Sequence, residues 1–219
     1  MIWNVILFVL MGWVIVMAFI TPAPQQVIGE ASRIFYFHVP QAWVAVVGFV
    51  VSMVASINYL RRGRLTDDDR ARVAAELGFV FCLLATVSGS IFAKVTWNSY
   101  WNWDPRETSI LFLLLIYGAY FALRSALTGD EKRARLAAVY SIFAFITVPF
   151  LVFVVPRVLP SLHPSDSVVD SAGQFSMSGT TAMIFFPALV AFSLLFFRLY
   201  ILGVRISILK RRRIEESQL

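Results

Sequence analysis

The 219-residue chain is poor in the residues that most often carry chemistry, with one cysteine and two histidines. A single cysteine cannot form an intrachain disulfide, and the lack of a C-x-x-C-H motif excludes a covalently attached c-type haem. Cys82 lies in an apolar run, so we interpret it as a small buried hydrophobe. The sequence also lacks a P-loop nucleotide motif and any serine, histidine and aspartate spacing typical of hydrolases. We therefore predict that the protein is not an enzyme.

Charged residues are scarce as well, at 15% of the chain, whereas 59% of the residues are hydrophobic and the mean hydropathy is +0.75. A soluble domain of this length could not cover so much apolar surface. The composition predicts an all-α membrane protein, a six-transmembrane-helix bundle that forms one integral domain over residues 1–219. The first span lacks the basic start and cleavage site of a signal peptide, so we expect a retained helix. The predicted spans, each near the ~20 residues that a bilayer core requires, are 3–20, 39–60, 74–95, 105–123, 136–155 and 180–202.

The distribution of basic residues predicts the orientation. Three regions, the loops 61–72 and 124–135 and the tail from 205, hold 14 of the 19 Lys and Arg residues. The positive-inside rule puts these regions and both termini in the cytoplasm, and it puts the connections 96–107 and 156–179 outside. Topology thus explains the net charge of +6, and no nucleic-acid partner is needed.

The segment 96–107 is unusually rich in indole rings, because Trp97, Trp101 and Trp103 are three of the six tryptophans in the chain. Aromatic rings with one polar edge collect at membrane interfaces. So many rings in one short external segment also suit a stacking platform for a large flat ligand. We interpret the segment as such a platform.

The end of this segment also has the pattern of a helix start. Asp104 suits the N-cap, Pro105 the first helical position and Glu107 the third position of a capping box. We therefore interpret Asp104 and Glu107 as caps rather than as direct ligand contacts. Arg106 is not explained in this way, because a cation in the first turn of a helix is mildly unfavourable. An anionic ligand group or an acidic partner surface would offset that cost.

The two histidines, His38 and His163, are predicted to lie at the outer side, just before the second and sixth spans. Two imidazoles can form a six-coordinate site on haem iron. Zinc is the alternative, with four ligands and with Glu30, Asp166 or Asp170 as added donors. The indole cluster favours a planar aromatic ligand, and so haem.

These residues carry a family resemblance. The run Trp97-x-x-x-Trp101-x-Trp103-Asp104-x-Arg106 resembles the WWD motif of the haem-handling proteins of cytochrome c maturation, and nearly the whole chain is similar to the CcmC family. The resemblance implies a bacterial cytoplasmic-membrane protein that holds haem b as cargo at the outer face. It also implies transfer of that haem to a CcmE-type periplasmic haem chaperone. The further partners implied are a CcmA/CcmB-type ABC transporter, a CcmD-type small membrane protein and membrane lipid.

The resemblance also implies individual roles. It makes His38 and His163 the axial ligands of the iron and Arg33 a basic residue near the first of them, available to a haem propionate. The remaining residues carried over belong to the platform: Trp97, Trp101, Trp103, Asp104 and Arg106.

Two departures from the family pattern bear on function. Asn98 replaces the usual glycine after the first tryptophan, and Pro105 with Glu107 is similar to the CcsA-type synthases and CcmF proteins. Those proteins usually carry further histidines inside their helices, which this chain does not. The pattern thus favours loading of a chaperone over a haem-lyase component that attaches haem to an apocytochrome.

Two other functional classes rank below this one. A transporter that moves haem through its own bundle would be expected to carry polar groups at mid-membrane. A cytochrome b-like electron carrier would bury its histidines within helices. The predicted helix centres are almost purely apolar, and both histidines are expected at helix ends.

Overall fold

The computed structural model describes residues 2–25, 27–163, 168 and 174–217. These residues fold into helices, as predicted, and six helical segments are long and apolar enough to cross a membrane. The protein is therefore a multi-pass membrane protein. The long helices are α1 (Ile2–Ile20), α2 (Phe35–Arg62), α3 (Leu65–Trp97), α4 (Pro105–Ala126), α5 (Asp130–Pro149) and α7 (Gly179–Glu216).

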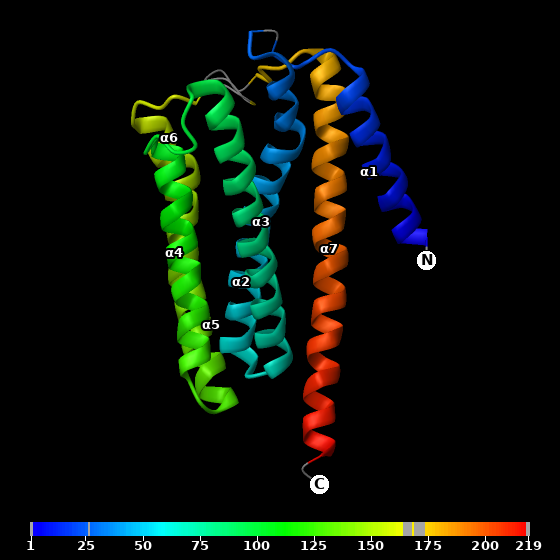
Figure 1. The fold of residues 1–219 in the computed structure, drawn as a ribbon. Coiled ribbons are helices and arrows are strands. Elements are labelled where there is room, and N and C mark those ends of the chain that lie inside the picture. Colours follow the sequence, from blue (N-terminus) through cyan, green and yellow to red (C-terminus); the bar gives the residue numbers. More distant parts are fainter. Residues whose placement is uncertain (1, 26, 164–167, 169–173, 218–219) are drawn as a thin grey trace.

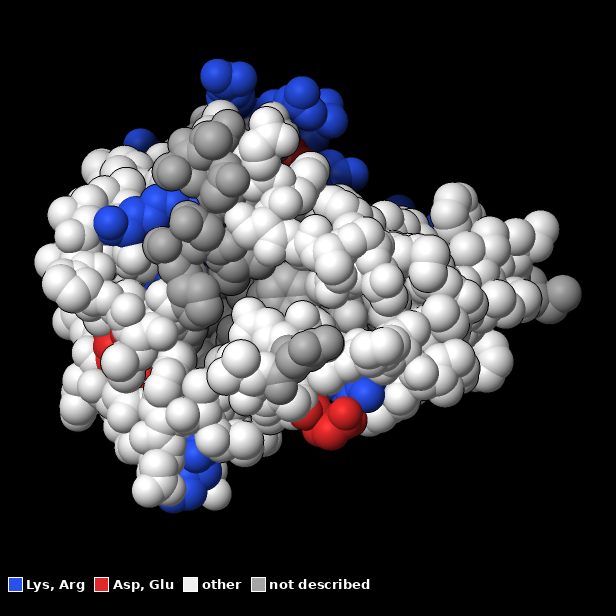
Figure 2. All heavy atoms as spheres, turned by 90° about the horizontal axis from the view of Figure 1, so that it is seen from above, with Lys and Arg blue, Asp and Glu red and all other residues white. Residues whose placement is uncertain are grey.

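The helices form one elongated bundle, and its upper end in Figure 1 holds the connections 21–34, 98–104 and 159–178. We call this the tryptophan end. Helices α2 and α3 run side by side at the centre, with α4 and α5 on one flank and α7 on the other (Figure 1). Helix α1 packs on α7 and is mostly exposed. Figure 2, which looks down on the tryptophan end, shows a mostly uncharged face with scattered Lys and Arg side chains and a few Asp and Glu side chains.

The centre of the bundle depends on small residues where α2 meets α3. A Cβ atom built on Gly48 would lie 2.7 Å from the Cα of Gly78, so the two backbones are nearly in contact. Small residues allow this close approach between membrane helices. Next to them, Phe49 stacks on Tyr117 of α4, with ring centroids 3.6 Å apart. A buried hydrogen bond of 3.1 Å between the hydroxyls of Ser52 and Ser141 joins α2 to α5.

We expect Gly48→Ala to destabilise the bundle by about 1–3 kcal/mol, because the added methyl group forces two packed backbones apart. Gly12→Ala in α1 is the matched control, since a Cβ there meets no atom within 4 Å. Denaturant unfolding of both variants in the same detergent would measure the difference. Equal stability of the two variants would contradict the close packing of α2 on α3.

Most of the observed helices begin earlier than the predicted spans, whereas α4 begins at Pro105 as predicted. Helix α2 begins at Phe35 instead of residue 39, so His38 lies in its first turn, and the prediction of His38 just before the helix was wrong. Helix α3 begins at Leu65 instead of residue 74. Hydropathy marks only the apolar part of a helix, whereas acidic residues such as Asp67 and Asp68 stabilise a charged first turn beyond it. Most of the predicted 61–72 loop is therefore helical.

The fifth span contains an irregular turn that the hydropathy pattern did not reveal. Helix α5 ends at Pro149 and is followed by a turn of π-helix, η2 (Phe150–Val154), and by the short helix α6 (Val155–Val158). Pro149 and Pro156 lack the backbone N–H that a regular helix uses, which accounts for the altered hydrogen bonding. Helix α6 lies at the tryptophan end of the bundle, where it packs against α4 (Figure 1).

Candidate functional site

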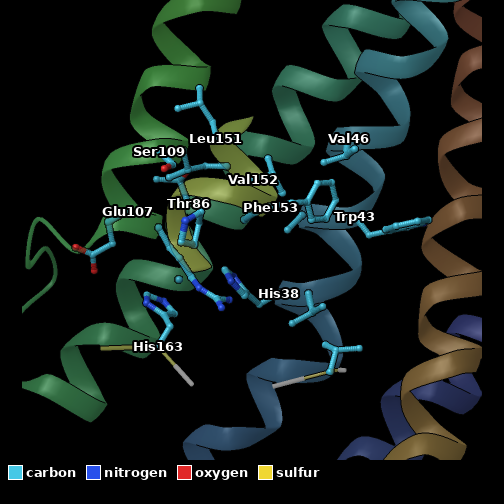
Figure 3. Close-up of a pocket in the computed structure, with 18 of the residues that line it drawn as sticks. His38, Trp43, Val46, Thr86, Glu107, Ser109, Leu151, Val152, Phe153 and His163 are labelled. Atoms are coloured by element: carbon cyan, nitrogen blue, oxygen red, sulfur yellow. The ribbon is translucent and has the colours of Figure 1, made fainter. Parts of the chain in front are cut away.

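A cavity of about 480 Å³ opens at the tryptophan end, between α2, α3, α4, the η2–α6 segment and α7. This volume is in the range of sites that bind small molecules and cofactors. Its apolar wall includes Val46, Leu151 and Leu189, and both histidines of the chain line it. In Figure 3 the imidazoles of His38 and His163 face one another across the pocket. The structure therefore brings together two side chains that are 125 positions apart in the sequence.

The His38 imidazole is oriented by helix α3. Its Nδ1 lies 2.9 Å from the Ser88 hydroxyl oxygen, and that hydroxyl donates to the Leu84 carbonyl at 2.9 Å. The serine oxygen is then the acceptor for an Nδ1–H, which leaves the lone pair on Nε2. The ring also fills the space above Gly89, where a Cβ would lie 2.9 Å from its Cε1 atom. Only glycine leaves room for the imidazole in this position.

The His163 imidazole is oriented by Asp104. Its Nδ1 lies 3.0 Å from Oδ1 of Asp104, and the edge of the Trp97 ring packs against the imidazole with centroids 4.8 Å apart. An ionised carboxylate can only accept, so Nδ1 carries the proton and Nε2 keeps its lone pair. This is the geometry in which a carboxylate orients a metal-binding histidine.

The Asp104 carboxylate is held by further donors from two parts of the chain. It accepts the backbone N–H of Arg106 at 2.9 Å, the backbone N–H of Leu162 at 2.6 Å and the hydroxyl of Ser161 at 2.9 Å. Asp104 therefore joins the start of α4 to the segment that carries His163. Both this carboxylate and the imidazole are largely shielded from solvent, with 1% and 20% of their side-chain surface exposed.

These contacts define the charge states. Burial alone would raise the pKa of Asp104, but the hydrogen bonds from Arg106, Leu162 and Ser161 outweigh it and hold the pKa below its usual range. Burial lowers the pKa of His163, and this effect exceeds the opposing attraction of Asp104. At neutral pH the pair is thus a carboxylate with a neutral imidazole, the protonation state that metal binding requires.

Asp104 and Glu107 also form the predicted capping box of α4, with Pro105 in the first turn. The Glu107 carboxylate accepts the backbone N–H of Asn102 at 2.7 Å, and so it also holds the tryptophan segment. The capping prediction is confirmed, but it was incomplete for Asp104, whose contact with His163 spans 59 positions of the chain. Glu107 itself also lines the cavity.

The three tryptophans of the segment do not share one surface. Trp101 lines the cavity, whereas Trp97 contacts His163 without lining the cavity. Trp103 is 70% exposed and meets Trp101 edge to face, with centroids 6.0 Å apart. Its backbone is left-handed, with φ of 55°, a strained state for so large a residue. Asn98, at the end of α3, has φ of 58°, a conformation that asparagine and glycine both tolerate.

Two arginines, Arg106 and Arg157, line the cavity. Arg157 was not among the predicted site residues; it lies in α6, which packs against α4 beside the cavity. Arg33 lies elsewhere: its guanidinium donates to the carbonyl oxygens of Ala18 and Thr21 at the end of α1 and pairs with Glu30. Its predicted contact with a propionate stays a prediction, and no contact in the described residues supports it.

The zinc alternative finds no support in the described part of the chain. Among residues 2–25, 27–163, 168 and 174–217, no three His, Cys, Asp or Glu side chains gather as a metal site. Glu30 is exposed and paired with Arg33, and Asp166 and Asp170 lie outside the described residues. Two imidazoles in an apolar cavity with two arginines fit haem better than they fit a tetrahedral zinc ion.

Comparison with known proteins supports the same interpretation. Residues 1–218 match the family model of CcmC, heme exporter protein C. The chain is 34% identical to heme exporter protein C of Bradyrhizobium diazoefficiens over 184 residues, which cover 84% of this chain and 69% of the relative. It is 29% identical to heme exporter protein C of Paracoccus denitrificans over 198 residues, or 90% of this chain and 81% of the relative. The protein of the same name from Escherichia coli K12 is 30% identical over 141 residues, or 64% and 56% of the two chains.

Proposed function

Since the chain belongs to the heme exporter protein C (CcmC) family, which supports a role in haem handling for cytochrome c maturation, we propose that it holds haem b as cargo between His38 and His163. One observation carries the proposal: the two imidazoles face the same cavity, and each has its Nδ1 engaged by a protein group. Each Nε2 is then available to iron, and two such ligands give a six-coordinate, low-spin haem.

The other cavity residues suit the rest of the haem molecule. The apolar wall that includes Val46, Leu151 and Leu189 would cover the porphyrin, and Trp101 adds an aromatic surface. Arg106 and Arg157 provide guanidinium groups for the two propionates, because guanidinium binds carboxylates in a bidentate geometry. The chain's task in this account is to bind and orient the cargo; the iron chemistry belongs to haem.

The proposed contact between an arginine and a haem propionate can be tested by removing the charge from the arginine or from the propionate. Arg157→Gln is expected to weaken haem binding by about 10-fold, the loss for one charge-assisted hydrogen bond of about 1.5 kcal/mol. Binding of haem dimethyl ester, which lacks the propionate charges, should change little. The control is Lys94→Gln, because Lys94 bonds Asn98 and does not line the cavity. An equal loss for haem and for its ester would refute a propionate contact.

We also propose that the exposed aromatic side chains of the α3–α4 connection receive a partner. Tyr100 is 61% exposed and Trp103 is 70% exposed, and both lie in the α3–α4 connection. The family resemblance supports a CcmE-type periplasmic haem chaperone as this partner and a complex with CcmA/CcmB-type and CcmD-type proteins. Trp103→Ala is expected to reduce transfer of haem to such a chaperone more than it reduces haem binding.

The proposed orientation has the tryptophan end in the periplasm and both termini in the cytoplasm. In a Cys82→Ser background, a cysteine at Tyr100 should react with a membrane-impermeant thiol reagent in intact cells. A cysteine at Thr128, in the exposed α4–α5 connection at the other end of the bundle, should react only after lysis. The reverse labelling pattern would overturn the orientation.

A further inference from the structure

The two histidines are oriented by hydrogen-bond acceptors of unequal strength. His163 is bonded to the carboxylate of Asp104, whereas His38 is bonded to the hydroxyl of Ser88. A charged acceptor forms a hydrogen bond roughly twice as strong as a neutral one and raises the basicity of the imidazole further. If both imidazoles bind one iron, the bond from His163 is therefore the stronger of the two.

The residue that orients His163 is also tied to more of the surrounding structure than the residue that orients His38. Asp104 accepts four donors, from Arg106, Ser161, Leu162 and His163, so the segment that carries His163 is tied to the start of α4. An asparagine here would have to turn its NH₂ group toward one of those donors. Ser88 holds the His38 ring less firmly. Its hydroxyl is neutral, and it is also bonded to carbonyl oxygens of its own helix.

Resting on the function proposed above, we infer that His163 is the retained ligand and that His38 is the ligand that leaves the iron when haem is handed on. Release breaks the bond between iron and Nε2 of His38 and forms one bond to an incoming ligand, with no change in the oxidation state of the iron. Haem then remains on the segment that Asp104 joins to α4, close to the exposed ring of Trp103. Asp104 and Ser88 are thus positioning residues with different tasks: one retains the cargo and the other sets how readily it is released.

Cyanide binding to the ferric haem-loaded full-length protein tests this inference, since cyanide can bind only after one histidine has dissociated. Ser88→Ala is expected to speed cyanide binding by about 2- to 10-fold, the effect of one lost neutral hydrogen bond. Ser193→Ala in α7 is the matched control, because Ser193 also donates to the carbonyl four residues before it, whereas only Ser88 of the two is bonded to His38. We expect wild-type rates for Ser193→Ala.

Two further variants identify which histidine is replaced. His38→Ala should retain haem on His163, and added imidazole should restore the six-coordinate spectrum. Asp104→Asn should lower haem affinity by about 10- to 100-fold, the usual loss for an orienting partner of a metal ligand. It should also raise the reduction potential, because the carboxylate no longer stabilises the ferric state.

The results that would overturn the inference are equally specific. Faster cyanide binding in Asp104→Asn than in Ser88→Ala, or unchanged rates in Ser88→Ala, would show that His38 is not the exchanging ligand. Retention of haem by His163→Ala together with its loss from His38→Ala would reverse the two roles. A wild-type protein without a bis-histidine haem spectrum would instead contradict the proposed function itself.

Discussion

Replacing both His38 and His163 with alanine is expected to abolish the six-coordinate, low-spin haem spectrum of the protein. The two residues provide the only imidazoles in the chain, and both line the cavity. Each single variant should also lose the six-coordinate signature, because one axial ligand is then missing. The absorption spectrum of purified protein loaded with haem would measure the change.

Folding should survive these substitutions, since neither imidazole belongs to the packed apolar core of the bundle. Thermal unfolding followed by circular dichroism provides the control. If the double variant keeps the wild-type spectrum, other side chains hold the iron. If it loses the spectrum only because the helices unfold, the ligand assignment would have to be tested by the single variants.

Gly89→Ala is expected to reduce haem affinity by about 10- to 100-fold, as for other changes that misorient a metal ligand. The new methyl carbon would lie 2.9 Å from Cε1 of His38, so the ring must rotate away from its bond to Ser88. Gly118→Ala in α4 is the matched control, because a Cβ there meets no atom within 4 Å. The control should keep wild-type affinity and gain up to about 1 kcal/mol in helix stability.

Haem titration of the two glycine variants, with unfolding measured in parallel, separates a ligand effect from a fold effect. The expected result is a loss of affinity confined to Gly89→Ala, without a large loss of stability. Equal haem affinities for the two variants would mean that the position of the His38 ring is not required for binding.

The helices could be predicted from the sequence because apolar runs of membrane length and capping residues are local signals. The start of α4 is the clearest example, since Asp104, Pro105 and Glu107 lie within four positions and act on one another. Helix starts with charged first turns, such as that of α3 at Leu65, were missed, because hydropathy does not detect them.

The meeting of the two histidines at one end of the bundle could also be predicted, since both were assigned to one side of the membrane and both line the cavity. Their partners could not. The contacts of Asp104 with His163 and of Ser88 with His38 span 59 and 50 positions, and only the packing of the helices brings these residues together. Arg157 was missed for a similar reason, because only the packing of α6 against α4 places it at the cavity.

The platform interpretation treated the tryptophans as equivalent, and the fold distinguishes them. Trp101 lines the cavity, Trp97 supports His163, and Trp103 remains exposed. No periodicity in a short irregular segment reveals which ring points where, because each orientation follows from local backbone angles such as the left-handed φ of Trp103. The sequence could therefore predict an aromatic segment at this end of the bundle, but not that its three rings would face different surroundings.

Pulsed electron paramagnetic resonance of the ferric haem-loaded protein, labelled with ¹⁵N only in histidine, tests the central claim most directly. With only two histidines in the chain, and with a purification tag free of histidine, the label occurs only at His38 and His163. Our account predicts that both axial nitrogens of the low-spin iron carry ¹⁵N couplings. Labelled nitrogen on one axial position only, or on neither, would contradict it.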